Sequence, residues 1–142
     1  MQLVDANVLL YAVNEASPRH RAARAWLDAS LTGNETVAFA WVALLAFLRL
    51  ATHEAVFPRP LSSNDAIDVL RSWLVRPTAV ILEPTRRHLD VVAELLSGVG
   101  TAGNLVNDVH LAALALEHGC ELVSFDSDFA RFPGLHWQAP GD

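Results

Sequence analysis

Apolar residues along the chain follow two alternating patterns. Short, almost fully apolar segments predict buried strands, and longer segments with an apolar residue at every third or fourth position predict helices. The predicted strands cover residues 3–4, 36–40, 79–82 and 122–125, with a further edge strand within 133–137. The predicted helices cover residues 8–13, 19–31, 42–54, 66–74, 85–96 and 106–117, and residues 62–65 are expected to cap the fourth helix.

This alternation of strands and helices predicts an α/β fold. We expect a central parallel sheet of four to five strands with helices on both faces. The glycine-rich segment 98–104 predicts a loop, but no linker or repeat divides residues 1–142, which are expected to form one domain. In open parallel sheets the functional crevice lies beyond the carboxyl ends of the strands. Polar residues at strand ends are therefore the first candidates for a site.

Acidic residues stand at the ends of two predicted strands. Asp5 follows the first strand, and Asp126 follows the fourth, with Asp128 two positions later. Asp108 lies in the first turn of an otherwise apolar helix and is expected to point towards the sheet. Each acid alone has a structural explanation, because aspartate forms turns and is favoured at helix starts. Together, however, converging carboxylates repel one another unless a cation joins them, and oxygen ligands favour Mg²⁺ or Mn²⁺.

The composition excludes several other classes of site. All ten cationic side chains among the 142 residues are arginines, and the lack of lysine rules out a P-loop and a Schiff-base enzyme. The single cysteine, Cys120, excludes an intramolecular disulfide and a cysteine-rich zinc module. The longest apolar run, residues 37–48, is too short to span a membrane. With the polar start of the chain, these features predict a soluble, cytoplasmic protein without a membrane partner.

Three segments around the acids resemble the motifs of a known family. These are Asp5-Ala6-Asn7 after the first strand, the helix segment Asn-Asp-Val-His-Leu-Ala-Ala-Leu-Ala at 107–115, and Leu-Val-Ser-Phe-Asp-Ser-Asp-Phe at 122–129. In this order and spacing they resemble PIN-domain ribonucleases, specifically the VapC toxins of bacterial toxin–antitoxin pairs. The resemblance spans nearly the whole chain and implies a PIN-like fold.

The resemblance implies a function and a set of site residues. The chain is expected to be a Mg²⁺-dependent endoribonuclease, with Mn²⁺ as an alternative ion, that hydrolyses phosphodiester bonds of tRNA, rRNA or mRNA. Asp5, Asp108 and Asp126 would hold the metal, with Asp128 and Asn7 beside them as further site residues. The same resemblance implies a homodimer, and a cognate antitoxin whose C-terminal segment occupies the acidic crevice.

One position departs from the family pattern. Such proteins place a Glu on the helix after the second strand, whereas the corresponding helix here has none and Ala46 is its nearest equivalent. Glu54 lies eight residues further on, about 12 Å along a helix, and is a poor substitute. The site is then expected to hold a second metal only with substrate, or to use Asp128 instead. A catalytically degenerate RNA- or protein-binding module and a small phosphatase remain as alternatives.

Other polar residues have two interpretations each. Asn7 is expected either to bond a carboxylate or phosphate, or to cap a helix. Arg49 is expected to contact a phosphate, or else to be a solvated surface arginine. His110 is expected to be a surface histidine rather than a neighbour of the site. The net charge of −6 argues against a nucleic-acid partner at first, but several of the acids belong to a cluster that a divalent ion would neutralise in part.

Overall fold

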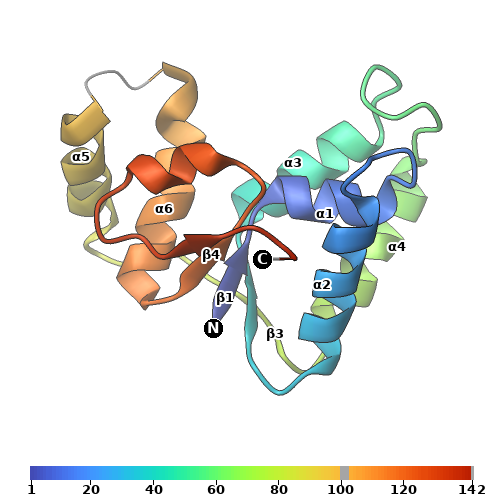
Figure 1. Ribbon diagram of the computed structural model, residues 1–142, viewed down its shortest axis with the longest axis horizontal. Helices are drawn as coiled ribbons and strands as arrows, with labels where there is room; N and C mark the ends of the chain where they lie inside the picture. The colour runs from blue at the N-terminus through green and yellow to red at the C-terminus, as the bar shows by residue number, and fades with distance from the viewer. Residues whose placement is uncertain (100–102, 142) are drawn as a thin grey trace.

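The strands form one parallel sheet. The computed structural model describes residues 1–99 and 103–141. The strands are β1 (Gln2–Val4), β2 (Val37–Phe39), β3 (Ala79–Ile81), β4 (Glu121–Val123) and β5 (Trp137–Gln138), in the spatial order β3-β2-β1-β4-β5. Every neighbouring pair is parallel, as the sequence predicts. The expected edge strand is present as β5, at the end of the predicted segment (Figure 1).

The helices occupy the segments predicted for them. The described residues form α1 (Ala6–Val13), α2 (His20–Thr32), α3 (Trp41–Ala51), α4 (Ser63–Leu74), α5 (His88–Val99) and α6 (Val106–His118), with 3-10 helices η1 (Gly103–Leu105) and η2 (Ser127–Arg131). As predicted, Ser62 caps α4, because its hydroxyl accepts a hydrogen bond from the Asp65 N–H at 3.1 Å. In the part of the chain that the structure describes, no helix combines the length and apolarity needed to cross a membrane.

Two helix ends and one loop differ from prediction. The third helix ends at Ala51 rather than residue 54, and the Thr52 hydroxyl bonds back to the Leu48 carbonyl at 2.8 Å. The fifth begins at His88 rather than residue 85, because the Thr85 N–H and hydroxyl both donate to a Glu117 carboxylate oxygen on α6. Of the predicted loop 98–104, the start belongs to α5 and the end to η1, while residues 100–102 lie outside the described residues.

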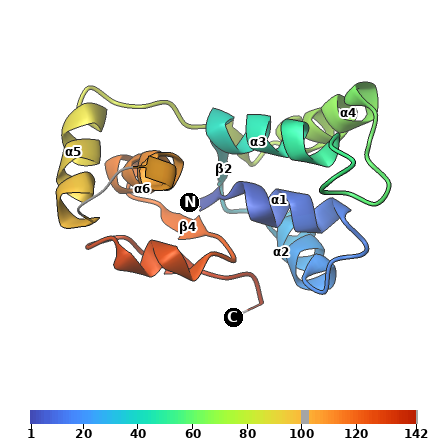
Figure 2. The same ribbon diagram turned by 90° about the horizontal axis from the view of Figure 1, so that it is seen from above.

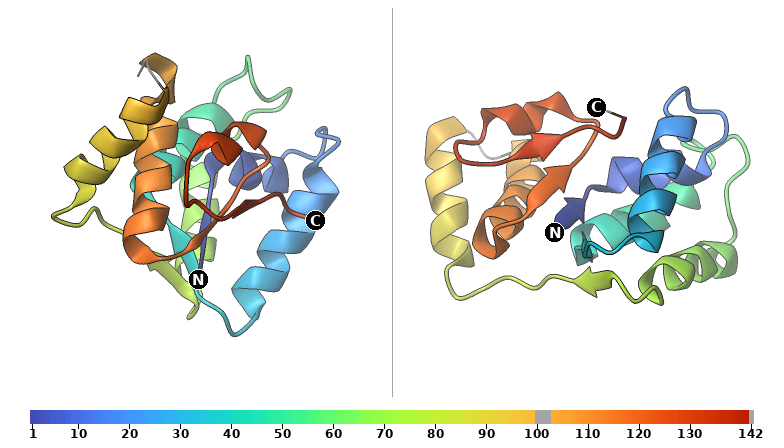
Figure 3. Two further views of the ribbon diagram at one scale, coloured as in Figure 1. Left: turned by 60° about the vertical axis from the view of Figure 1, so that its left-hand side comes forward. Right: turned by 60° about the horizontal axis from the view of Figure 1, so that its bottom comes forward.

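Side chains alternate between two cores, one on each face of the sheet. Val4 and Val123 pack with helices α1 to α4 in one core, whereas their neighbours Leu3 and Leu122 pack with α5 and α6 in the other. Figure 2 and Figure 3 show these two groups of helices on opposite sides of the central strands. The prediction that helices cover both faces is therefore confirmed.

Strand β1 lies at the centre of the sheet, where the connections reverse direction. The chain passes from β1 through α1 and α2 to β2 on one side, and β4 later pairs with β1 on the other side. Beyond the paired region, the Asp5 N–H still bonds the Val123 carbonyl at 3.0 Å. The crevice at the carboxyl ends of β1 and β4 is the place where such sheets bind ligands.

Candidate active site

A buried hydroxyl joins the ends of β1 and β4. Ser124, directly after β4, is fully buried and is the one buried polar residue among residues 1–99 and 103–141. Its Oγ donates to Asp5 Oδ2 at 2.7 Å and accepts from Asn7 Nδ2 at 3.1 Å and from the Asp126 N–H at 3.0 Å. These three bonds use the full hydrogen-bonding capacity of one hydroxyl. Ser124 therefore fixes Asp5 relative to the loop that bears Asp126.

Asp5 is held by both of its carboxylate oxygens. One oxygen accepts the bond from Ser124, and the other accepts the Ala6 N–H at 2.7 Å, which makes Asp5 the cap of α1. Burial raises the pKa of this carboxyl, the two hydrogen bonds lower it, and the nearby Asp126 raises it, with a net rise. The side chain is thus rigid and destabilised in its charged form, which favours a cation beside it.

Asn7 is bonded to the residues that follow β4. Asp5 rather than Asn7 caps α1, so the capping interpretation is wrong. The Asn7 amide instead donates to Ser124 and accepts the Phe125 N–H at 3.2 Å. It therefore ties α1 to the loop after β4, and its oxygen already has a partner within the protein.

Asp126 and Asp128 begin the 3-10 helix η2. Asp126 Oδ1 accepts the Asp128 N–H at 2.9 Å, which caps the helix. Asp128 is exposed, and its Oδ1 lies 3.3 Å from a terminal nitrogen of Arg131. The two acids therefore differ: Asp126 is anchored to the strand end through Ser124, whereas Asp128 faces solvent with an arginine partner.

Asp108 projects from the first turn of α6 towards the same acids. Its pKa is raised to about 6, first by burial and then by repulsion from Asp5, Asp126 and Asp128, while Arg131 lowers it. Repulsion of this kind requires the other carboxylates to lie close by. The four acids that the sequence singles out therefore lie at the same edge of the sheet, within range of electrostatic repulsion.

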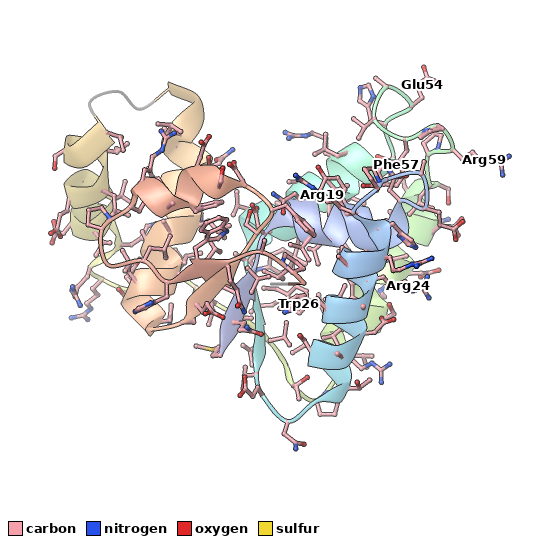
Figure 4. The ribbon with its side chains drawn as sticks, in the orientation of Figure 1. Arg19, Arg24, Trp26, Glu54, Phe57 and Arg59 are labelled. Carbon is pink, nitrogen blue, oxygen red and sulfur yellow. The ribbon has the colours of Figure 1, made fainter. Side chains whose placement is uncertain are left out.

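A cleft of about 450 Å³ lies beside these acids, between α3 and α6. Asp5 and Asp108 line it, together with Ala46 and Arg49 from α3. The missing carboxylate therefore corresponds to a methyl group on the cleft wall. Figure 4 shows Glu54 at the tip of the loop between α3 and α4, pointing outwards, so it does not replace that carboxylate. A larger hollow of about 590 Å³ between α2 and α4 contains none of the four acids.

The donor set suits a hard divalent cation that keeps most of its water. Within the described ranges, no three His, Cys, Asp or Glu side chains stand close enough to chelate one ion directly. Mg²⁺ is commonly held by one or two carboxylates and several waters, and it does not need a closed protein cage. Burial first, and the neighbouring carboxylates after it, raise the pKa values of Asp5 and Asp108, so that a cation beside them would stabilise their charged forms. The chemistry of the site therefore fits such an ion.

His110 is half-buried against a second histidine, so the prediction of a surface histidine is wrong. Its Nδ1 is 2.8 Å from His88 Nε2 on α5, and His88 Nδ1 contacts a Glu117 carboxylate oxygen. Burial and the neighbouring His88 lower the pKa of His110. The three side chains hold α5 against α6, because His110 and Glu117 lie two turns apart on α6 and both reach His88 on α5.

Two side chains that lie near the acids, Ser124 and Arg131, are not predicted by the sequence analysis. Ser124 has the clearer signal, since a small hydroxyl stands between an apolar strand and Asp126. Arg131 follows Asp128 by three residues, a spacing at which side chains meet within a helical turn, and its charge lowers the pKa of Asp108.

Comparisons with known proteins agree with this fold. The family model of the PIN domain matches residues 3–135 of this chain. The chain is 56% identical over 140 residues to Ribonuclease VapC37 of Mycobacterium tuberculosis. The matched region covers 99% of this chain and 97% of that protein. The fold is similar to that of VapBC2 from Rickettsia felis, solved with a DNA fragment from its promoter, with a TM-score of 0.72, 20% identity and 98% of both chains covered. It is also similar to VapC20 of Mycobacterium tuberculosis, described as a toxin cleaving the sarcin-ricin loop, with a TM-score of 0.65, 15% identity, and 96% of this chain and 99% of that chain covered.

Proposed function

Because this chain belongs to the PIN-domain family, and within it to the VapC ribonucleases, we propose that it is a divalent-metal-dependent endoribonuclease and the toxin of a toxin–antitoxin pair. The observation that carries the proposal is the convergence of Asp5, Asp108 and Asp126 at the carboxyl edge of the sheet. Burial, and after it repulsion from the neighbouring carboxylates, raises the pKa values of Asp5 and Asp108.

The chain's own residues would prepare the site for hydrolysis of RNA. Asp5, Asp108 and Asp126 would hold Mg²⁺ or Mn²⁺, one or two of them directly and the rest through water on the ion, with Asp128 at the outer edge of the cluster. A bound ion of this kind supplies Lewis acidity towards a phosphate oxygen and lowers the pKa of a coordinated water. Ser124 and the Ala6 N–H keep the Asp5 carboxylate in one orientation. Arg49, on the wall of the same cleft, would attract a phosphate of the substrate.

The methyl group of Ala46 supports a second candidate function. Without a carboxylate there, the cleft has fewer ligands than the family pattern provides, which fits a degenerate module that binds RNA or protein without cutting. The two candidates differ in metal dependence. The proposed nuclease cleaves RNA only when Mg²⁺ or Mn²⁺ is present. A binding module binds RNA and leaves it intact at every metal concentration.

The acidic cleft and the apolar surface beside it support two partners. The carboxylates offer a docking point for an arginine of a cognate antitoxin, since arginine pairs with carboxylates in two parallel hydrogen bonds. On the outer side of α3, Trp41 is 48% exposed and Leu45 57% exposed in the single chain. We infer that this apolar strip is covered in a homodimer. We infer that the protein acts in the cytoplasm, where it would meet an RNA substrate and an antitoxin.

Inducible expression in a bacterial host tests the whole proposal. Production of the chain is expected to arrest growth and to generate RNA fragments. Co-expression of the antitoxin encoded beside it is expected to restore growth. An Asp5→Asn variant, produced at the same level, is expected to cause neither effect. Arrest by the Asp5→Asn variant, or arrest without RNA fragments, would contradict the proposal.

A further inference from the structure

Arg19 lies across two aromatic rings next to the acid cluster. Its guanidinium carbon is 5.1 Å from the centroid of Phe125 and 5.9 Å from that of Tyr11. The two rings lie 5.4 Å apart, tilted by 59°. These residues come from three different parts of the fold, namely the turn before α2, the loop after β4, and α1. Figure 4 shows the Arg19 side chain over α1, whereas Arg24 points outwards from α2.

Within the described part of the chain, the charge of Arg19 has no acidic partner. Arg24, Arg71 and Arg131 each pair with an aspartate three or four residues away on the same helix. Over residues 1–99 and 103–141, no carboxylate lies within ion-pair distance of Arg19, and its guanidinium makes no hydrogen bond to the protein. The residue is exposed, so its N–H donors are available to a ligand. A guanidinium resting on aromatic rings keeps its edge free for hydrogen bonds while its face is held in place.

Hydrogen bonds connect the segments that carry the Phe125 and Tyr11 rings to the acid cluster. Phe125 directly precedes Asp126, and its N–H bonds Asn7, which in turn bonds Ser124. Tyr11 follows Asn7 by one turn of α1, and the Tyr11 carbonyl lies 2.8 Å from His20 Nδ1, which fixes the start of α2 beside Arg19. The position of Arg19 relative to Asp5 and Asp126 is therefore set by a continuous network.

We propose that Arg19, supported by Phe125 and Tyr11, is an RNA-binding residue that contacts a backbone phosphate of the strand bound in the acidic site. This inference rests on the proposed nuclease function. A chain with a net charge of −6 and no lysine must attract a polyanion through a few well-placed arginines. A cation held beside the acids, and not neutralised by any of them, meets that need. Arg49 lines the cleft from α3, whereas Arg19 stands over α1 and the loop after β4, so the two would contact the strand at separate points.

Steady-state cleavage of a fluorescent single-stranded RNA, measured at several salt concentrations with saturating Mg²⁺, tests this role. Arg19→Gln is expected to raise KM about tenfold and to change kcat less than about twofold, because one charge-assisted contact made in both ground and transition state is lost. The slope of log KM against log salt is expected to fall by about 0.7, the value for one phosphate on a single strand. Arg19→Lys, which retains the charge, is expected to keep the salt slope.

Arg71→Gln is the matched control. Arg71 is an exposed arginine on α4, and its replacement is expected to change neither KM nor the salt slope. Phe125→Leu is expected to raise KM with an unchanged salt slope, because the charge stays but loses its aromatic support. An unchanged KM and salt slope in Arg19→Gln would overturn the inference, as would weaker antitoxin binding with normal KM. Absence of cleavage by the wild-type chain would instead refute the nuclease function itself.

Discussion

Ser124 Oγ donates a hydrogen bond to Asp5 Oδ2 at 2.7 Å, and this contact joins the carboxyl ends of β4 and β1. The same hydroxyl accepts bonds from Asn7 and from the backbone of Asp126, so that one small buried residue orients two of the acids. Hydrogen bonds that orient metal ligands commonly affect metal affinity almost as strongly as the ligands themselves.

Ser124→Ala is therefore expected to impair the site and the fold together. Loss of the donor raises the pKa of Asp5 further, and we expect a 10- to 100-fold weaker metal affinity or activity. The Asn7 amide and the Asp126 N–H also lose Ser124 Oγ as their buried acceptor, which lowers the free energy of unfolding by about 1–3 kcal/mol. Ser124→Thr keeps the hydroxyl and is expected to retain most of the activity, and Ser72→Ala on exposed α4 serves as the surface control. Wild-type metal affinity in Ser124→Ala, measured by calorimetry, would contradict the role of the hydroxyl.

Asp108 is expected to destabilise the metal-free protein. Its folded pKa of about 6 exceeds its ordinary value of 3.8, so the charged form is disfavoured in the fold at pH 7 and the penalty disappears as the pH falls below about 4. Asp108→Asn is expected to stabilise the metal-free chain at pH 7 by about 1–2 kcal/mol, less than the full shift implies because the carboxylate is half exposed and screened. The same variant is expected to lose nearly all RNA cleavage.

Thermal unfolding without metal, at pH 7 and at pH 4, measures this effect. Asp90→Asn is the matched control, because Asp90 is an exposed acid in the first turn of α5. It is expected to leave cleavage unchanged and to lower Tm slightly, because it removes a charge that the helix start favours without relieving any repulsion. A lower Tm for metal-free Asp108→Asn at pH 7 would show that the carboxylate is stabilising, contrary to the repulsion described above.

Metal binding is expected to weaken as the pH falls. Asp108, with a pKa of about 6, and Asp5, with a raised pKa, must both lose their protons before they serve as ligands. Below about pH 6 the Mn²⁺ affinity is therefore expected to drop by about tenfold or more per pH unit, and binding is expected to release protons into the buffer. Calorimetric titrations in buffers of different ionisation enthalpy detect that release. A constant affinity from pH 5 to pH 8 would be inconsistent with these carboxylates as ligands.

Ala46→Glu is expected to strengthen metal binding by adding a carboxylate to the cleft wall shared with Asp5 and Asp108. Half-maximal cleavage is then expected at a lower Mg²⁺ concentration than in the wild type. Ala46→Gln, which has the same size without the charge, is expected to show no such gain. Equal behaviour of the two variants would mean that position 46 does not face the bound ion.

The sequence is sufficient to predict the sheet and the place of the four acids at its edge, because strand ends and helix faces follow from local patterns. Asp5 and Asp126 end two parallel strands, so their proximity follows from topology alone. The contacts that the sequence does not reveal join distant residues. Phe125 meets Arg19, and His110 meets His88, only after the helices have packed. The start of α5 differs from the prediction for the same reason, because Thr85 is bonded to Glu117 on α6.

Cleavage of RNA by the purified chain during metal titration tests the central claim most directly. After removal of divalent ions with a chelator, the wild-type chain is expected to leave RNA intact, and cleavage is expected to rise with added Mg²⁺ or Mn²⁺ and to saturate. Asp126→Asn is expected to show no cleavage over the same range. Cleavage that persists in the chelator, or that Asp126→Asn carries out at the wild-type rate, would contradict a metal-dependent nuclease site built on these acids.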